Sequence, residues 1–324
     1  MHKVTLSNGV EFMCSEAQTI LEAAKISNVA IEHSCRTGRC GICAAPISRG
    51  ETRLVGSEES LSDHDSSSGK ILTCSRTPLT DIHLDINDLG EIGSLKTLTL
   101  PCRIDSIRAY NDDVLSLVLR LPPNSNFNFL PGQYLNLIRG DIRRSYSIAN
   151  AQRADGKLEL QVKRVEQGSM SAILFSQVKE NDLLRVEGPL GTFSYRDDGE
   201  QNVILMATGT GVAPIKALLE SFSSDFGRKN IFVVWGGRYK KDLYLNVESI
   251  LENITYVPVL SRDNQQGFFH GYVQQAVLSL DLDLVKSSVY ACGSEVMIKD
   301  ARECLLNNGL PLKRFYSDAF VSSN

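Results

Sequence analysis

Four cysteines in the first quarter of the sequence have the spacing of metal-cluster ligands. Cys35, Cys40 and Cys43 lie on one short segment, and Cys74 follows 31 positions after Cys43. Free thiols rarely gather in this way without a metal. A zinc site more often has two C-x2-C pairs, and the second pair is missing here. The C-x4-C-x2-C spacing therefore predicts a [2Fe–2S] cluster bound by these four cysteines.

The residues around this cysteine loop also suit a cluster. Gly38 and Gly41 let the backbone turn close to the sulfurs and offer N–H groups to them. We expect His33 to be a packing or surface residue, because four cysteines already satisfy both irons. Arg36 and Arg39 place positive charge beside the cluster. This indicates either a docking surface for a partner protein or side chains that only neutralise the negative charge of the cluster.

A second motif, Arg144-Ser145-Tyr146-Ser147, follows an expected strand at 134–138. An arginine can hold a pyrophosphate as a bidentate fork, and a tyrosine can lie flat on an isoalloxazine ring. We expect Ser147 to share a strand face with the arginine and to hydrogen-bond the N5 edge of a flavin. Alone, this four-residue pattern is weak, and its alternative is an ordinary polar strand end.

A third motif, Gly168-Ser169-Met170-Ser171, opens an expected helix. A helix N-terminus with a glycine and small residues is an anion site, so we expect it to bind the pyrophosphate that the arginine of the second motif holds.

A glycine-rich turn joins the apolar run at 203–206 to an expected helix at 213–222. The residues that we expect to bind a dinucleotide here are Gly209, Thr210, Gly211 and Pro214. Glycines admit a pyrophosphate to a helix N-terminus, and proline suits the first helical turn. The turn departs from the G-x-G-x-x-G fingerprint because Pro214 replaces the third glycine.

In this order, the motifs resemble those of the ferredoxin–NADP reductase superfamily, and the segment before them resembles plant-type ferredoxins. The resemblance implies a flavin site at Arg144, Tyr146, Ser147, Gly168 and Ser171. It implies FAD rather than FMN, because the FMN branch carries its ferredoxin part at the C-terminus.

The resemblance also implies roles for residues near later strand ends. Cys292 and Gly293 would lie beside the nicotinamide C4, where a small side chain leaves room for hydride transfer. The alternative for Cys292 is a buried structural cysteine, as we expect for Cys14, Cys102 and Cys304. Phe320 either covers the flavin face where the nicotinamide enters or is a core aromatic.

The choice between NADH and NADPH depends on the residues that follow two of the expected strands. Arg238 ends one strand and is expected to face the adenosine half of the dinucleotide, while Ser261 and Arg262 resemble the pair that holds the 2′-phosphate in NADP enzymes. The second basic residue of those enzymes is missing from 267–272. A single arginine would bind a dianionic 2′-phosphate only weakly. We therefore expect NADH as the electron donor, with NADPH as the alternative.

Four segments resemble a narrower family, the CDP-6-deoxy-Δ3,4-glucoseen reductases, and the resemblance covers the whole chain. These segments are 101–107, 143–150, 187–193 and 316–320. The resemblance implies electron supply to a pyridoxamine-phosphate-dependent dehydratase in the synthesis of CDP-linked 3,6-dideoxyhexoses. The alternatives are the reductase component of a bacterial oxygenase, whose acceptor is an oxygenase component, and a redox-sensing or binding module without enzymatic activity.

The surrounding elements predict three domains that position these motifs. Residues 1–92 are expected to form an N-terminal β-grasp ferredoxin domain, followed by a linker at 88–97. Short strands with Gly and Pro turns predict an antiparallel β-barrel flavin domain over 98–198. Apolar strands that alternate with helices predict a doubly wound parallel-sheet nucleotide domain over 199–324. The fold class is multidomain, α+β and α/β.

Charge and hydropathy exclude several other functions. The net charge is −4, and residues 1–92 carry 13 acidic and 8 basic side chains. An acidic N-terminal third does not suit nucleic-acid binding, although it could steer a basic partner protein. No run approaches the roughly 20 apolar residues that span a bilayer, and the first residues lack a signal-peptide pattern. We therefore expect a cytoplasmic protein without membrane or nucleic-acid partners.

Overall fold

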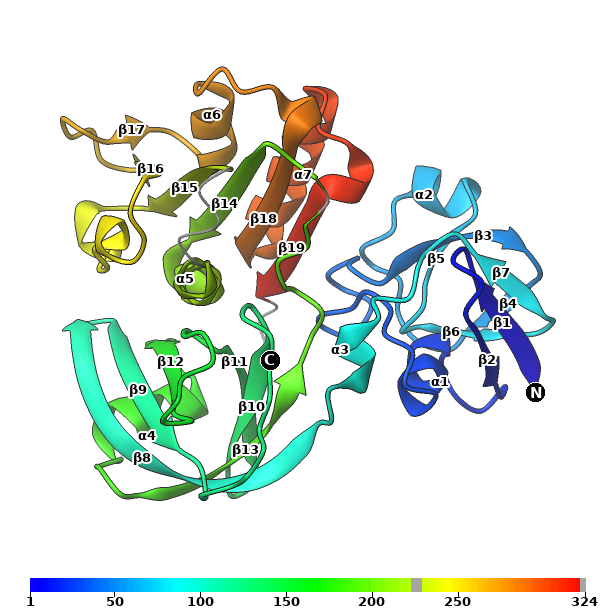
Figure 1. Cartoon of the computed structure of the whole chain (residues 1–324), viewed down its shortest axis with the longest axis horizontal. Coiled ribbons are helices and arrows are strands. Elements are labelled where there is room, and N and C mark those ends of the chain that lie inside the picture. Colours follow the sequence, from blue (N-terminus) through cyan, green and yellow to red (C-terminus); the bar gives the residue numbers. More distant parts are fainter. Residues whose placement is uncertain (198, 223–228, 321–324) are drawn as a thin grey trace. The chain divides into compact units, whose positions relative to one another are not determined.

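The computed structural model describes residues 1–197, 199–222 and 229–320. The chain divides into two compact units, Met1–Lys96 and Thr97–Asn324 (Figure 1). None of the helices in the described part of the chain combines the length and the apolar character needed to cross a bilayer.

The first unit is built on a five-stranded mixed sheet in the order β2-β1-β7-β3-β5. The strands are β1 (His2–Leu6), β2 (Glu11–Cys14), β3 (Ala44–Arg49), β5 (Lys70–Leu72) and β7 (Ile82–Leu84). Strands β1 and β2 form an antiparallel hairpin, and Gly9 in its turn has a φ of +81°, which favours glycine. Strand β1 also pairs in parallel with β7, so the N-terminal strand lies inside the sheet.

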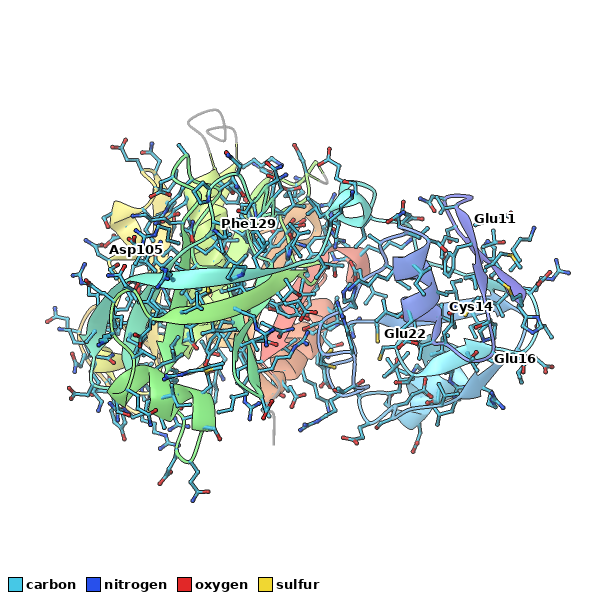
Figure 2. All side chains as sticks on the ribbon, turned by 90° about the horizontal axis from the view of Figure 1, so that it is seen from below. Glu11, Cys14, Glu16, Glu22, Asp105 and Phe129 are labelled. Carbon is cyan, nitrogen blue, oxygen red and sulfur yellow. The ribbon has the colours of Figure 1, made fainter. Side chains whose placement is uncertain are left out.

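Helix α1 (Ile20–Ile26) begins at a capping box, as the sequence predicts. The Thr19 side chain accepts a hydrogen bond from the Glu22 amide, and the Glu22 carboxylate accepts one from the Thr19 amide. Glu22 and the buried Cys14 on β2 are labelled in Figure 2. The helix buries Ile20 and Leu21 in the core of this unit, so the cysteine loop that follows it begins from a rigid support.

Smaller elements complete the first unit. They are β4 (Thr52–Leu54), β6 (Arg76–Pro78), α2 (Asp63–Ser67) and α3 (Glu91–Ser94). Strands β4 and β6 form a separate antiparallel pair, and β6 begins two residues after Cys74. Helix α3 is a single turn inside the segment that the sequence predicts to be a linker. No local pattern predicts this helix, because α3 has no side-chain cap at its N-terminus.

The first half of the second unit is a curved antiparallel sheet in the order β11-β10-β13-β8-β9-β12. Its elements are β8 (Leu98–Asn111), β9 (Val114–Arg120), β10 (Tyr134–Arg139), β11 (Ile142–Ser147), β12 (Leu158–Lys163), β13 (Leu183–Leu190) and α4 (Ser169–Ser176). A bridge between Ile148 and Leu160 brings the two ends of the sheet together. The enclosed core includes Phe129 (Figure 2). This half is the predicted antiparallel barrel.

The second half is an all-parallel sheet in the order β17-β16-β15-β14-β18-β19. Its strands are β14 (Asn202–Thr208), β15 (Asn230–Gly237), β16 (Ile254–Leu260), β17 (Phe269–His270), β18 (Ser287–Ser294) and β19 (Phe315–Phe320). The strand order reverses between β14 and β18, and ligands of open α/β sheets bind at such a reversal.

Helices cover both faces of this parallel sheet. They are α5 (Val212–Ser221), α6 (Val273–Leu278) and α7 (Glu295–Asn307), with 3-10 turns η1 (Gly209–Gly211), η3 (Lys240–Asp242), η4 (Val247–Ser249), η5 (Leu284–Lys286) and η6 (Leu312–Arg314). Helices α6 and α7 pack against each other, and Figure 1 shows α5 on the opposite face. The doubly wound arrangement and the overall fold class that the sequence predicts are confirmed.

Candidate functional site

The cysteine loop lies between α1 and β3, and its two glycines have backbone conformations that favour glycine. Gly38 has a φ of +77° and Gly41 a φ of +73°. A Cβ on Gly38 would come within 1.8 Å of the Ser57 carbonyl oxygen, so no other residue fits there without moving the loop. The tight path brings the backbone amides close to the sulfurs.

The four cysteines meet in two pairs. The amides of Thr37 and Cys40 each lie 3.4 Å from the Cys35 sulfur, and the Cys40 thiol hydrogen-bonds to Cys35. The sulfurs of Cys43 and Cys74 are 3.2 Å apart. Within the described residues, no three His, Cys, Asp or Glu side chains gather around one metal position. Two pairs of thiols fit a two-iron cluster better than a single tetrahedral zinc.

The pairing also changes the acidity of the thiols. The hydrogen bond from Cys40 lowers the pKa of Cys35 to about 4, and the bond with Cys43 lowers the pKa of Cys74 to about 7. The same bonds, together with burial, raise the pKa values of Cys40 and Cys43. Each pair therefore contains one cysteine whose pKa is lowered, which favours the thiolate, the form of cysteine that binds metal.

His33 lies beside the loop, and both of its ring nitrogens contact protein atoms. Nδ1 is 2.9 Å from the Ile31 carbonyl oxygen, and Nε2 is 3.3 Å from the Arg36 guanidinium. Burial lowers the pKa of His33 to about 4, so the ring is neutral. With Nδ1–H donating to Ile31, Nε2 accepts from Arg36. His33 thus supports the loop as a packing residue.

The other cysteines lie away from this loop. Cys14 and Cys102 are buried, as the sequence predicts for structural cysteines. Burial raises the pKa of Cys14 to about 11 and that of Cys102 to about 12. Cys304 is only partly buried on α7, so the prediction that it is a buried structural cysteine was wrong. It occurs on the amphipathic helix α7, whose buried residues are Met297, Ile298, Ala301 and Leu305.

The second motif forms β11, the edge strand that pairs with β10. Alternation along this strand places Arg144 and Tyr146 on one face and Ser147 on the other. The expectation that Ser147 shares the arginine's face was therefore wrong, because the two residues are three positions apart and not two. The Arg144 guanidinium donates a hydrogen bond of 2.8 Å to the Arg143 carbonyl oxygen. Burial raises the pKa of Tyr146 to about 12.

Ser147 is the most telling residue of this motif. It is buried, and within the part of the chain that the structure describes its hydroxyl has no hydrogen-bond partner. Buried hydroxyls nearly always have a partner, so an unsatisfied one indicates a bound group that completes it. The flavin N5 edge, which the sequence assigns to Ser147, is a group of the right kind.

The third motif begins helix α4, which packs against β11. Gly168 is the N-cap, and no side chain caps the first amides of the helix. Ser169 begins the helix, and Met170 is buried under it. The Ser171 hydroxyl forms hydrogen bonds with the backbone of Val165 and Gly168, so it shapes the turn before the helix. The uncapped amides can donate hydrogen bonds to a phosphate.

The glycine-rich turn forms η1 and leads into α5. A Cβ on Gly211 would lie 2.2 Å from the Cys292 carbonyl oxygen, so the turn packs directly on the end of β18. The Trp235 indole donates 2.9 Å to the Gly209 carbonyl. Thr210 lies between the two glycines, and Pro214 is in the first turn of α5. The start of α5 has no side-chain cap, which leaves its amides for a pyrophosphate.

Cys292 lies at the carboxyl end of β18, in register with Ala207 on β14 and Asp318 on β19. It is fully buried, and burial, followed by the Asp318 carboxylate, raises its pKa well above the usual range. Its thiol is therefore neutral and fits a small packing group, not a nucleophile or a base. Next to it, a Cβ on Gly293 would lie 2.2 Å from the Thr208 hydroxyl oxygen.

Phe320 ends β19 in register with Ser294, one residue beyond Gly293. Its side chain is 37% exposed, so it is not a core aromatic. An exposed aromatic beside the strand end that carries Cys292 is available to cover a flat ring.

The structure brings together the residues that bear on dinucleotide choice. Arg238 follows β15, and Ser261 and Arg262 follow β16. The Ser261 amide donates a hydrogen bond of 3.0 Å to the Gly237 carbonyl oxygen. The Arg262 amide donates one of 3.1 Å to the Arg238 carbonyl oxygen. The Asp242 carboxylate accepts from the Arg238 amide at 2.8 Å. Two arginines and a carboxylate thus share one end of the sheet.

Sequence reasoning missed Lys163, the last residue of β12. Its ammonium nitrogen would be 4.0 Å from a Cβ placed on Gly209, so it lies beside the dinucleotide turn. A cation at this distance can contribute to holding a phosphate. The alternation of polar and apolar residues over 158–163 is the available signal, but it contains no information about contact with Gly209, 46 positions later.

Three protein families match consecutive parts of the sequence. They are described as "2Fe-2S iron-sulfur cluster binding domain" over residues 4–79, "Oxidoreductase FAD-binding domain" over 101–195 and "Oxidoreductase NAD-binding domain" over 205–303. The chain therefore carries iron–sulfur, FAD-binding and NAD-binding domains, in the order of the motifs.

Full-length relatives share this organisation. The chain is 41% identical to the CDP-6-deoxy-L-threo-D-glycero-4-hexulose-3-dehydrase reductase of Yersinia pestis, over 98% of this chain and 97% of that protein. It is 28% identical to terephthalate 1,2-dioxygenase reductase component 1 of Comamonas, over 97% and 95%. The crystal structure of an Amycolatopsis cytochrome P450 reductase superposes with a TM-score of 0.76, at 25% identity and 99% coverage of both chains.

Proposed function

The chain belongs to the family of CDP-6-deoxy-L-threo-D-glycero-4-hexulose-3-dehydrase reductases, and from this we propose that its electron acceptor is the dehydrase of that reaction. It is an NAD(P)H-dependent oxidoreductase with FAD and a [2Fe–2S] cluster. The observation that carries the proposal is 41% identity over nearly the whole of both chains, against 28% for an oxygenase reductase.

Cys35, Cys40, Cys43 and Cys74 are the proposed cluster ligands. The two close pairs and the amides that face the Cys35 sulfur support this assignment. N–H groups aimed at cluster sulfurs stabilise negative charge there and tune the potential. When bound, the FAD and the cluster together convert a two-electron hydride into single electrons.

For the flavin, the proposed residues divide by position. Arg144 and Tyr146 lie on one face of β11, which suits a pyrophosphate grip and a ring contact, respectively. The unsatisfied Ser147 hydroxyl supports a hydrogen bond to the N5 edge. The uncapped start of α4, from Gly168 and Ser169 to Met170, offers amides to the same pyrophosphate, while Ser171 holds the turn.

For the dinucleotide, the turn from Gly209 to Gly211 and the first residues of α5 are proposed to hold the pyrophosphate. Gly293 leaves room at the end of β18, and the neutral Cys292 thiol excludes water without taking part in proton transfer. Phe320 is proposed to cover the flavin face until the nicotinamide enters. The catalytic assignments therefore are Ser147, Cys292 and Phe320.

NADH is proposed as the physiological electron donor. Arg238 and Arg262 lie at the same end of the sheet, which would favour a 2′-phosphate, but the Asp242 carboxylate accepts hydrogen bonds from the Arg238 and Tyr239 amides in the same loop. A fixed carboxylate repels a dianionic phosphate and offsets one of the two arginines. A ribose hydroxyl, in contrast, can donate to a carboxylate.

Reconstitution with an acceptor tests this function. The purified chain, NADH, the dehydrase and its CDP-linked hexulose are combined without oxygen, and NADH consumption and 3-deoxygenated product are measured. We expect product only when the chain and the dehydrase are both present. Replacing the dehydrase by an oxygenase component is the control. If the oxygenase component takes electrons faster and the dehydrase takes none, the chain serves an oxygenase and the proposed acceptor is wrong.

A further inference from the structure

Strand β12 is buried on both of its faces, although alternate residues on it are polar. Leu158, Leu160 and Val162 point into the barrel core. Glu159 and Gln161 point the other way, yet they are only 6% and 4% exposed. Polar groups buried to this degree usually serve a defined contact, because burial without a partner is costly.

The contact of Glu159 is with Lys216 on α5. The Lys216 ammonium donates to the Glu159 carboxylate at 3.0 Å, to the Glu220 carboxylate at 2.5 Å and to the Ala149 carbonyl at 2.9 Å. The side chains of Glu159 and Lys216 are 8% and 11% exposed. All three ammonium protons therefore have an acceptor in a site shielded from water.

The other acceptor sites of the Glu159 carboxylate are also filled. Oε1 accepts from the Tyr110 hydroxyl at 3.2 Å and from the Ser116 hydroxyl at 3.4 Å, and Oε2 accepts from Arg153 at 3.2 Å. A carboxylate with this many donors is fixed in one orientation. The ion pair is therefore a rigid connection between the barrel and α5.

This connection joins the dinucleotide-binding part of the proposed reaction site to its flavin-binding part. Lys216 is two residues beyond Pro214, on the helix that begins at the dinucleotide turn. Ala149 is two residues beyond Ser147, the proposed partner of the flavin. Ala149 is held twice, since its amide also donates 2.7 Å to the Glu159 carbonyl. The Glu220 carboxylate accepts from the Ala151 amide at 3.0 Å, which adds a third tie to the same segment.

We propose that the Lys216–Glu159 pair is a positioning pair for hydride transfer, which fixes the start of α5 relative to the backbone that follows Ser147. Hydride transfer requires the donor carbon of the nicotinamide and the acceptor nitrogen of the flavin to be nearly in contact. Small displacements of either atom reduce the rate steeply. The Lys216 side chain hydrogen-bonds both to Glu159 on β12 and to the Ala149 carbonyl, so it ties the dinucleotide helix to the segment after Ser147 and controls this separation. The inference rests on the proposed transfer from the nicotinamide to FAD at this site.

The test uses the full chain with its cofactors and the variants Glu159→Gln, Lys216→Met and Lys216→Arg. Stopped-flow reduction of the flavin is measured over a range of NADH concentrations. We expect Lys216→Met and Glu159→Gln to lower the limiting rate by about tenfold or more, with little change in the NADH concentration that gives half of that rate. Lys216→Arg restores part of the rate because it keeps the charge.

Hydrogen exchange supplies a readout apart from activity. In Lys216→Met, the amides of residues 149–151 should exchange faster than in the parent, both with and without bound FAD. Lys229→Met is the matched control. It breaks another ion pair with a buried carboxylate, between Lys229 and Glu200, neither of which lies on α5 or β12. It should lower thermal stability without changing the limiting rate.

The outcomes separate this inference from the proposed function. If the parent is not reduced by NADH, the proposed function itself fails. If the parent is reduced and the folded, FAD-containing Glu159→Gln and Lys216→Met variants react at the parent rate, the positioning role is overturned. The same holds if Lys229→Met slows the reaction as much as Lys216→Met does, because the effect would then be general destabilisation. Should Lys216→Met not fold, Glu159→Gln alone decides.

Discussion

The amide of Arg262 donates a 3.1 Å hydrogen bond to the carbonyl oxygen of Arg238. The bond joins the loops after β15 and β16, which are 24 residues apart in sequence, and places two arginines at one end of the parallel sheet. This is where the adenosine half of a dinucleotide is expected, so the relationship bears directly on the choice between NADH and NADPH.

Arg262→Ala should leave kcat/KM for NADH within about twofold, because no 2′-phosphate is bound when NADH is the donor. NADPH should remain the poorer donor in both the parent and the variant. Steady-state reduction of ferricyanide with each dinucleotide measures this. A higher kcat/KM for NADPH in the parent, lost in Arg262→Ala, would show that the arginines bind the 2′-phosphate and that the NADH proposal is wrong.

Cys40→Ser should remove the cluster and leave the flavin reducible by NADH. The parent is expected to contain about two irons and two sulfides per chain, since four thiolates match a [2Fe–2S] site. Iron and sulfide analysis and the visible spectrum measure the loss. Cys304→Ser is the control, because Cys304 lies on α7 in the other unit, and it should keep the full cluster content. A colourless parent loaded with zinc would falsify the cluster assignment.

The cluster-less variant should also separate two kinds of acceptor. If electrons pass from the flavin to the cluster, Cys40→Ser should still reduce ferricyanide at a rate close to the parent. It should lose most of its cytochrome c reduction, which needs a one-electron donor at the surface. Stopped-flow traces of the parent give the order of events. Bleaching of the cluster before, or without, reduction of the flavin contradicts the proposed path.

Arg36 and Arg39 test whether the cluster loop is a docking surface. Arg36 is exposed with a φ of +60°, and Arg39 lies 4.0 Å from Glu59. Replacing both by glutamate should slow electron transfer to the partner by about tenfold and change its dependence on salt. Dye reduction should not change. Equal partner rates in the parent and the variant at low salt would mean that the arginines only offset the charge of the cluster.

Ionisation of the Cys292 thiol should not contribute to the pH dependence of flavin reduction. Burial and Asp318 raise the pKa of its thiol, so the neutral form persists to higher pH than for an ordinary cysteine. Between about pH 6 and pH 9, where a free cysteine titrates, the limiting rate should show no inflection from this group. Cys292→Ser should give a pH profile of the same shape. An inflection that disappears in Cys292→Ser would show that the thiol ionises during turnover.

Local patterns in the sequence predicted most of the fold. The Thr19–Glu22 capping box, the hairpin turn at Gly9 and the apolar runs of β14 and β15 depend on neighbours a few residues apart, so they could be recognised without tertiary information. The single-turn helix α3 could not, since it has no capping side chain.

The face of Ser147 was wrong for another reason. Ser147 is three positions after Arg144, so the period of two along β11 places these two side chains on opposite faces of the strand. The same structure supplies the more informative fact, which is that the buried hydroxyl is unsatisfied. Burial depends on everything packed around a side chain, and no pattern of four residues contains that information.

The sequence by itself determined the three cofactor motifs and their order, because the ligands of each motif lie mostly on one short segment whose spacing reflects the ligand. Only the tertiary structure decided how distant segments combine. It paired Cys43 with Cys74, joined Arg238 to Arg262 and placed Lys216 between Glu159 and Ala149. Each of these contacts forms between residues that 24 to 67 positions separate, and their distance is set by the packing of whole sheets and helices, which chain spacing does not encode.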